Sequence, residues 1–196
     1  MPEDLETRLR RAVAQLPHGL RDHVLRVEQE ALRLAELHGL DAARIRIAAL
    51  GHDLVRHKRG PELLRLAAEY ALEPDEVERE APILVHGPVA ARILRRDYAL
   101  ADEEVLAGID CHTTGRAGMT ALEKALFVAD KVEPEKRAGQ PALEAARDAA
   151  ASDLDAAMLL YLDFYLGEAV RRRHLLHPRT LEARNELIRT LKPPAS

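Results

Sequence analysis

The sequence is poor in aromatic residues: its 196 residues include four Tyr, two Phe and no Trp. Leu, Ala, Val and Ile must therefore fill the core, and such a core suits helices better than sheets. The shortage also leaves little material for stacking the bases of a nucleic-acid strand, and the formal net charge of −4 does not attract polyanions. We therefore expect no nucleic-acid partner, and any phosphate site must be local.

Cysteine and long apolar runs are scarce as well. The single Cys111 excludes an internal disulfide, and we interpret it as a small buried residue rather than a redox group. No stretch approaches the about eighteen apolar residues of a membrane span. The N-terminal segment MPEDLETRLRRAVAQL is charged where a signal peptide is apolar. These absences lead us to expect a cytoplasmic protein that does not enter a membrane.

Apolar residues recur at helical spacing along the chain. In the first segment Leu5, Leu9, Val13 and Leu16 lie three or four residues apart, and Pro17 ends the run. No segment shows sustained alternation of apolar and polar residues. The sequence therefore predicts an all-α fold, a single-domain bundle of roughly nine or ten helices. We expect an N-terminal helix over residues 1–17, the main domain over 18–192 and a frayed tail over 193–196.

Three segments are of interest for function. A helix capped by Asp41 is predicted to run through IRIAALGHDLV, which places the pair His52-Asp53 inside an apolar helix. The segment TTGRAGM is a Gly-rich break between two helices. Residues 134–141 contain two prolines and a glycine, and they are predicted to form a surface loop.

The polar side chains within apolar segments indicate a metal site. His52 and Asp53 need polar partners, although an adjacent His-Asp pair by itself is also typical of a satisfied core pair. Further histidines and a carboxylate lie at helix ends or inside helices. Four imidazoles and two carboxylates are too many for one metal that keeps positions open for water and substrate, whereas two ions bridged by a carboxylate would use them all. The six candidates are His23, His52, Asp53, His86, His112 and Asp130.

The order H…HD…H…H…D resembles that of the HD-domain phosphohydrolases, and more closely their YqeK-like branch, the symmetrical bis(5′-nucleosyl)-tetraphosphatases. The resemblance extends from about Leu20 to Leu187 and is visible in LRVEQEALRLAELHGL, AALGHDL, LVHGPVAARIL, HTTGRAGMTALEKALFVADKVEP and HPRTLEARN. It implies that the six candidates are metal ligands and that a substrate loop contains Thr113, Thr114, Gly115, Arg116 and Gly118.

The resemblance also implies an activity, the metal-dependent hydrolysis of diadenosine tetraphosphate to two ADP. Ions bridged by Asp53 would lower the pKa of a water, which then attacks the phosphate as hydroxide, with His52, Asp53 and Arg116 as the catalytic residues. Mixed imidazole and carboxylate ligation suits two divalent transition-metal ions, with manganese, cobalt and nickel as candidates beside iron. The resemblance favours iron.

A substrate with four phosphates needs positively charged side chains to bind it, in addition to the metal ions. Arg26 lies one helical turn after His23, Arg56 and Lys58 follow the HD motif, and Lys131 follows Asp130, so we expect these four and Arg116 to contact the phosphate chain. For Lys58, a position in a solvated surface turn is an equal alternative. Two positions depart from the family pattern. Arg56 stands where the family usually has Lys, and Ala117 stands where it usually has Pro.

Other functions remain open. The HD site specifies only attack on phosphorus, so another nucleotide or phosphate ester is an alternative substrate. A nucleotide-binding module without turnover would use the same metal site. Tyr70 and Tyr98 could stack on adenine, although core positions in helices explain both. A homodimer is expected only because it is the most frequent assembly of soluble proteins.

Overall fold

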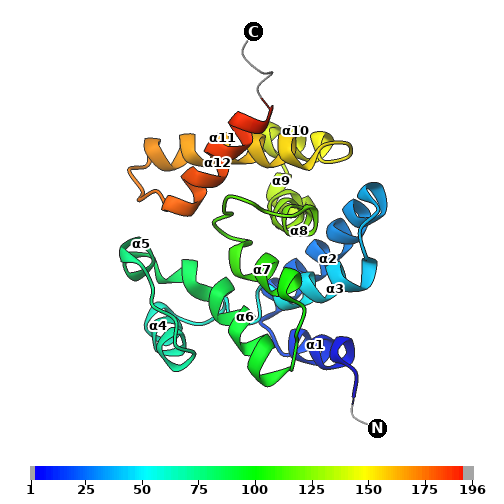
Figure 1. Cartoon of the computed structure of the whole chain (residues 1–196), viewed down its shortest axis with the longest axis vertical. Coiled ribbons are helices and arrows are strands. Elements are labelled where there is room, and N and C mark those ends of the chain that lie inside the picture. The colour runs from blue at the N-terminus through cyan, green and yellow to red at the C-terminus, as the bar shows by residue number, and fades with distance from the viewer. Residues whose placement is uncertain (1–2, 192–196) are drawn as a thin grey trace.

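The computed structural model describes residues 3–191, and every regular element within them is a helix (Figure 1). The all-α prediction is confirmed. The described elements are α1 (Leu5–Ala14), α2 (His18–His38), α3 (Ala42–Gly51), α4 (Gly60–Glu69), α5 (Glu76–Glu80), the 3-10 helix η1 (Pro82–Val85), α6 (His86–Asp97), α7 (Glu103–Cys111), α8 (Ala121–Val132), α9 (Pro134–Arg137), α10 (Pro141–Ala149), α11 (Leu154–Arg171) and α12 (Pro178–Leu191).

The helix count differs from the prediction because two of the twelve α-helices are very short. Helix α5 has five residues and α9 has four, which is too short for an apolar period to show in the sequence. Each begins at a carboxylate that accepts a hydrogen bond from a backbone N–H, Asp75 for α5 and Glu133 for α9. The predicted surface loop over 134–141 is therefore wrong in its first half, where the chain is helical.

Helix α8 forms the centre of the bundle (Figure 1). Ten of its twelve residues are buried, because it packs against α2 and α7 on one side and against α10 and α11 on the other. A helix that is apolar around most of its circumference is stable only in such surroundings. Asp130 and Lys131 therefore lie in the interior even though they are charged.

Helix α3 ends earlier than predicted. Its last residue is Gly51, and the HD motif that follows forms a turn in which Leu54 and Arg56 bond to carbonyls three residues earlier. A Cβ on Gly51 would lie 2.6 Å from Cδ1 of Leu94, so a larger residue here would force the Leu94 side chain to move. Apolar spacing could not distinguish this turn from continued helix, because both place every third or fourth residue inside.

The first helix is part of the same core as the rest of the chain. Leu9 and Val13 of α1 are buried against the bundle. The boundary at residues 17 and 18 stays a prediction, and the predicted tail, 193–196, lies outside the described residues. Among the described helices, none combines the length and apolar character that a membrane crossing requires.

Gly87 permits a close approach of α6 to the C-terminal end of α7. A Cβ at this position would lie 2.8 Å from the carbonyl oxygen of Ile109, 2.9 Å from that of Asp110 and 3.1 Å from the ring of His112. Backbone atoms cannot move aside as a flexible side chain can. The glycine therefore allows His86, its neighbour in the chain, to lie beside His112.

We expect Gly87→Ala to lower the free energy of unfolding by about 1–3 kcal/mol, because the added methyl group overpacks a rigid contact. Urea unfolding followed by circular dichroism measures this change. Gly19→Ala is the matched control: Gly19 is also helical, but a Cβ there has no atom within 4 Å, so this variant should be at least as stable as the parent. Equal stability of the two variants would contradict the proposed role of Gly87.

Candidate metal centre

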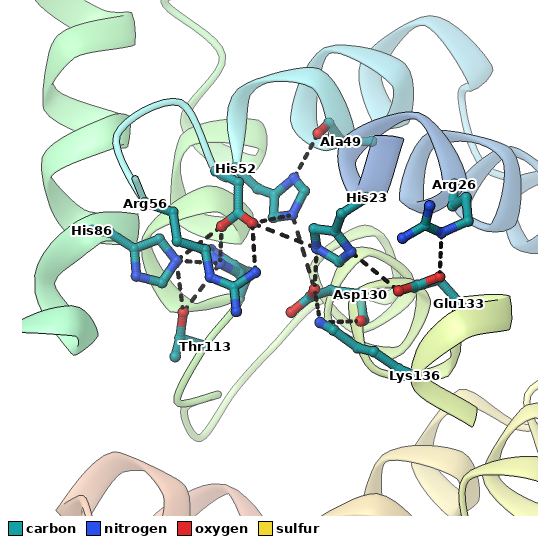
Figure 2. A network of polar contacts seen from close by, with 12 residues as sticks. His23, Arg26, Ala49, His52, Arg56, His86, Thr113, Asp130, Glu133 and Lys136 are labelled. Atoms are coloured by element: carbon teal, nitrogen blue, oxygen red, sulfur yellow. Dashed lines mark hydrogen bonds and ion pairs between the residues drawn. The ribbon is translucent and has the colours of Figure 1, made fainter. Parts of the chain in front are cut away.

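The six predicted ligands converge on one buried cluster, of which Figure 2 labels His23, His52, His86 and Asp130. They come from five places in the chain: the first third of α2, the turn after α3, the start of α6, the end of α7 and the last third of α8. Each of these residues is at most 6% exposed. The six are His23, His52, Asp53, His86, His112 and Asp130.

Asp53 lies between two pairs of imidazoles. Its Oδ2 is 3.5 Å from Nε2 of both His23 and His52. Its Oδ1 is 3.0 Å from Nε2 of His86 and 3.5 Å from that of His112. Each carboxylate oxygen thus faces a different pair of imidazoles.

The second carboxylate completes one half of the cluster. Oδ1 of Asp130 is 3.0 Å from Nε2 of His23 and 3.9 Å from Nε2 of His52. Within the described residues, Nε2 of both histidines and Oδ1 of Asp53 are buried without any hydrogen-bond partner. Buried polar atoms without partners are costly, and cations would satisfy all three. The donor set therefore fits divalent metal ions.

The ligand set contains nitrogen and oxygen donors only. Cys111, the neighbour of His112, is fully buried, and its sulfur points to the carbonyl oxygen of Gly108 at 3.9 Å. Burial raises the pKa of its thiol to about 12, so the thiolate form is disfavoured. The structure confirms Cys111 as a small buried residue.

Three of the four histidines are oriented in the same way. His52, His86 and His112 are the C-cap residues of α3, η1 and α7. In each, Nδ1 donates to the carbonyl oxygen three residues earlier, at 2.6 Å for His52 and 2.7 Å for His112. The last carbonyls of a helix lack partners within it, so they are free to accept. This bond fixes the tautomer and directs Nε2 into the cluster.

His23 is oriented by a carboxylate. It lies within α2, in the second turn, and its Nδ1 faces Oε1 of Glu133 at 3.3 Å (Figure 2). Oε2 of Glu133 accepts a hydrogen bond of 2.7 Å from Nε of Arg26. Burial raises the pKa of Glu133, but the hydrogen bonds from Arg26 and from the backbone of Glu135 outweigh burial, and the net pKa is lowered. An ionised Glu133 therefore holds the ring of His23.

The protonation states of the cluster suit cation binding. Burial is the main cause that lowers the pKa of His52 to about 3, so this imidazole is neutral near pH 7 and its lone pair is available. Burial works against ionisation of Asp53 and Asp130. Even so, the nearby imidazoles and, for Asp130, Lys131 and Lys136 hold both carboxyl pKa values well below their usual range.

A cavity of about 430 Å³ opens beside the cluster. Four of the ligands form one wall, and positively charged and apolar side chains form the others. This combination suits a phosphorylated ligand with an apolar part. The lining residues are Asp53, Arg56, Ile83, His86, His112, Thr113, Asp130, Lys131, Lys136, Gln140, Leu143, Tyr161 and Phe164.

Comparison with protein families identifies this arrangement. The sequence profile of the HD domain matches residues 20–135, which is more than half of the chain. The chain belongs to the HD-domain family.

This HD-domain protein is similar to several proteins named bis(5′-nucleosyl)-tetraphosphatase, symmetrical. It is 32% identical to the one from Halalkalibacterium halodurans, over 85% of this chain and 87% of that protein. It is 37% identical to the one from Staphylococcus aureus over 67% of each. A crystal structure of a predicted HD superfamily hydrolase involved in NAD metabolism from Clostridium acetobutylicum has a TM-score of 0.88 at 30% identity, covering 94% of this chain and 97% of that one. These likenesses confirm the resemblance inferred from the sequence motifs.

Three of the predicted substrate contacts line the cavity of this HD-domain protein. Nη1 of Arg56 is 3.0 Å from Oδ2 of Asp53, and Nζ of Lys131 is 2.6 Å from Oδ2 of Asp130. The hydroxyl of Thr113 lies 3.1 Å from Nε2 of His112. All three are therefore within reach of a phosphate bound at the cluster.

Arg116, a predicted catalytic residue, is not among the residues that line this cavity. Its Nη2 lies 2.6 Å from both carboxylate oxygens of Glu123, and its Nη1 donates to the carbonyl oxygens of Ala117 and Gly118. Glu123 is buried in the first turn of α8, so the guanidinium is held at the base of the loop. Nothing in the sequence pattern showed that Glu123, seven residues later, would hold Arg116.

The remaining predicted contacts also lie elsewhere. The Gly-rich loop is fastened to α12, since the hydroxyl of Thr180 donates to the carbonyl oxygen of Thr114 and the N–H of Gly118 donates to Glu186. Gly115 has a positive φ of 67°, and a Cβ there would lie 2.9 Å from Met158. Lys58 lies 3.9 Å from Glu62 on the surface, and Arg26 contacts Glu133. None of these residues lines the cavity, and Arg26 reaches the cluster only indirectly, through Glu133, which contacts His23.

Sequence reasoning missed Lys136. Its Nζ donates to the backbone oxygen of Asp130 at 2.7 Å and lies 2.6 Å from Oδ1 of the same residue (Figure 2). The segment that contains it was predicted to be a surface loop. Only the turn between α8 and α9 brings this ammonium group back to the cluster.

Glu133→Gln should weaken metal binding about 10- to 100-fold, because the neutral amide no longer fixes and polarises His23. Isothermal titration of the metal-free protein with Mn²⁺ measures the affinity. Glu135→Gln is the matched control: Glu135 also pairs with Arg26, at 2.6 Å, but it is 73% exposed and belongs to no contact of His23. If both variants bind Mn²⁺ as the parent does, Glu133 has no positioning role.

Proposed function

We propose that this protein hydrolyses dinucleoside tetraphosphates in the middle of the phosphate chain, converting diadenosine tetraphosphate and water to two ADP. The observation that carries the proposal is the position of Asp53. Its two oxygens face separate imidazole pairs at the edge of a cavity lined by positively charged side chains. The relatives named symmetrical bis(5′-nucleosyl)-tetraphosphatase support the choice of substrate, since they match up to 85% of the chain.

Two divalent transition-metal ions are the proposed cofactors. His23, His52 and Asp130 would hold one ion, His86 and His112 the other, and Asp53 would bridge them. Nitrogen and carboxylate donors without sulfur suit iron, manganese, cobalt or nickel, and iron is our first choice. When bound, such ions lower the pKa of a water and compensate charge on the attacked phosphate.

The side chains of the protein supply the binding of the phosphate chain. Arg56, Lys131 and Lys136 line the cavity next to the ligands, so their positive charges face the place where the phosphates would lie. Arg56 uses one guanidinium N–H on Asp53 and has further donors for phosphate oxygens. Its planar fork replaces the point charge of the lysine that is usual in the family. Thr113 adds a hydroxyl beside His112.

The product pair tests the proposal. Purified protein is loaded with ferrous iron under anaerobic conditions, with Mn²⁺ in a parallel sample, and diadenosine tetraphosphate is added. We expect chromatography to show two ADP per substrate and no ATP. AMP plus ATP would overturn the symmetrical cleavage, and no turnover despite bound metal, confirmed by elemental analysis, would overturn the substrate assignment.

Replacing Asp53 tests the site itself. Asp53→Asn should abolish turnover, because the amide cannot offer an anionic oxygen to each half of the cluster. Elemental analysis of the variant should also show reduced metal content, and circular dichroism reports whether the fold is kept. Lys58→Ala is the control, since Lys58 lies on the surface near Glu62 and should keep parental turnover. Parental turnover in Asp53→Asn would contradict the assignment of the metal centre.

A further inference from the structure

Helix α11 carries half of the aromatic residues of a chain that has only six. Tyr161, Phe164 and Tyr165 are spaced i, i+3 and i+4, so they lie on one face of the helix. Tyr161 and Phe164 line the cavity beside the metal cluster. The two tyrosines considered from the sequence lie elsewhere, with Tyr70 bonded to Asp97 and Tyr98 under Arg8. The aromatic surface next to the cluster therefore belongs to α11.

A second cavity, of about 540 Å³, continues along the same helix. It shares Gln140 and Phe164 with the first cavity, so the two cavities adjoin at these residues, and we call them together the groove. The remaining lining residues come from the later turns of α11 and the segment that follows it. They are Tyr165, Glu168, Ala169, Arg172 and His174.

The ring of Tyr165 is oriented by its neighbours. It lies nearly parallel to the ring of Tyr161, with an interplanar angle of 14° and 6.0 Å between the centroids. The ring of Tyr161 in turn packs edge-on against Phe127 in the core, at 5.5 Å. Tyr165 is 36% exposed, so part of its ring remains available to a ligand in the second cavity. An oriented, partly exposed ring is suited to stacking with a nucleobase.

The charges of the two cavities differ. Arg56, Lys131 and Lys136 are confined to the first cavity, next to the metal ligands. In the second cavity Arg172 lies 3.3 Å from Glu168, so this charge is largely compensated within the groove. The first cavity thus favours phosphates, and the second favours a ligand part with little net charge, such as a nucleoside.

We propose that the second cavity binds the distal nucleoside of the dinucleotide, with Tyr165 as the stacking surface for its base. This inference rests on the proposed function. A substrate that is cleaved in the middle carries a nucleoside diphosphate on each side of the broken bond, so its site needs room for two nucleosides. The groove offers this room, since the first cavity takes the reacting phosphates and the near nucleoside, and the second takes the far one.

Comparing two substrates tests the distal subsite. Diadenosine tetraphosphate has two nucleosides, whereas adenosine 5′-tetraphosphate has one, which can occupy the first cavity; its central hydrolysis yields ADP and pyrophosphate. Tyr165→Ala should lower kcat/KM for diadenosine tetraphosphate about tenfold, mainly through KM, and should change that for adenosine 5′-tetraphosphate far less. Tyr165→Phe keeps the aromatic ring, so it should retain most of the parental kcat/KM for diadenosine tetraphosphate.

Leu160→Ala is the matched control, because Leu160 is exposed on the same helix and belongs to neither cavity lining. It should leave both substrates unaffected, and thermal unfolding of all variants shows whether the fold is kept. If the parent cleaves diadenosine tetraphosphate but Tyr165→Ala affects both substrates equally or neither, the distal subsite is overturned and the proposed function stands. If the metal-loaded parent cleaves no dinucleotide, both proposals fail.

Discussion

The structure depends on the burial of two carboxylates among four imidazoles. Ionised Asp53 and Asp130 lie in an interior that is otherwise filled by Leu, Ala, Val and Ile, and such charges are tolerated only when they are compensated. Part of the compensation comes from Lys131 and Lys136. The donor atoms that remain without hydrogen-bond partners, among them Nε2 of His52, are the ones that cations would satisfy. The fold thus builds a site whose buried donor atoms suit divalent metal ions.

Three of the candidate histidine ligands are oriented by their positions at helix ends. A histidine at the C-cap finds a free carbonyl three residues earlier, and this local bond directs its other nitrogen outward from the helix end. His52, His86 and His112 use this device at three helices that meet at the cluster. His23 is within a helix, where the carbonyls are already bonded, and it depends on Glu133 from a distant part of the chain. Three of the four histidines are therefore positioned by a local hydrogen bond, and His23 is positioned by a tertiary contact.

The predicted site residues also differ in whether local sequence or tertiary structure decides their place. The six candidate ligands were recognised because polar residues that interrupt apolar segments stand out and because their order matched a family, and the structure brings all six together. Substrate contacts were inferred from proximity in sequence; of these, Lys131 lines the cavity and Arg116 does not. Arg116 is close to His112 along the chain, but Glu123 binds its guanidinium. Lys136 was overlooked because a short helix returns it to the cluster.

The sequence by itself determined the all-α fold, the breaks between most helices and the identity of the buried polar residues. These features follow from the local periodicity of apolar residues, from capping residues such as Asp41 and Asp102, and from residue types that are costly to bury without partners. The tertiary structure alone decided that Asp53 lies between two imidazole pairs, which cations face the cavity and that α11 supplies its aromatic wall. Those outcomes depend on the packing of helices far apart in the chain, and spacing along the sequence does not encode which faces will meet.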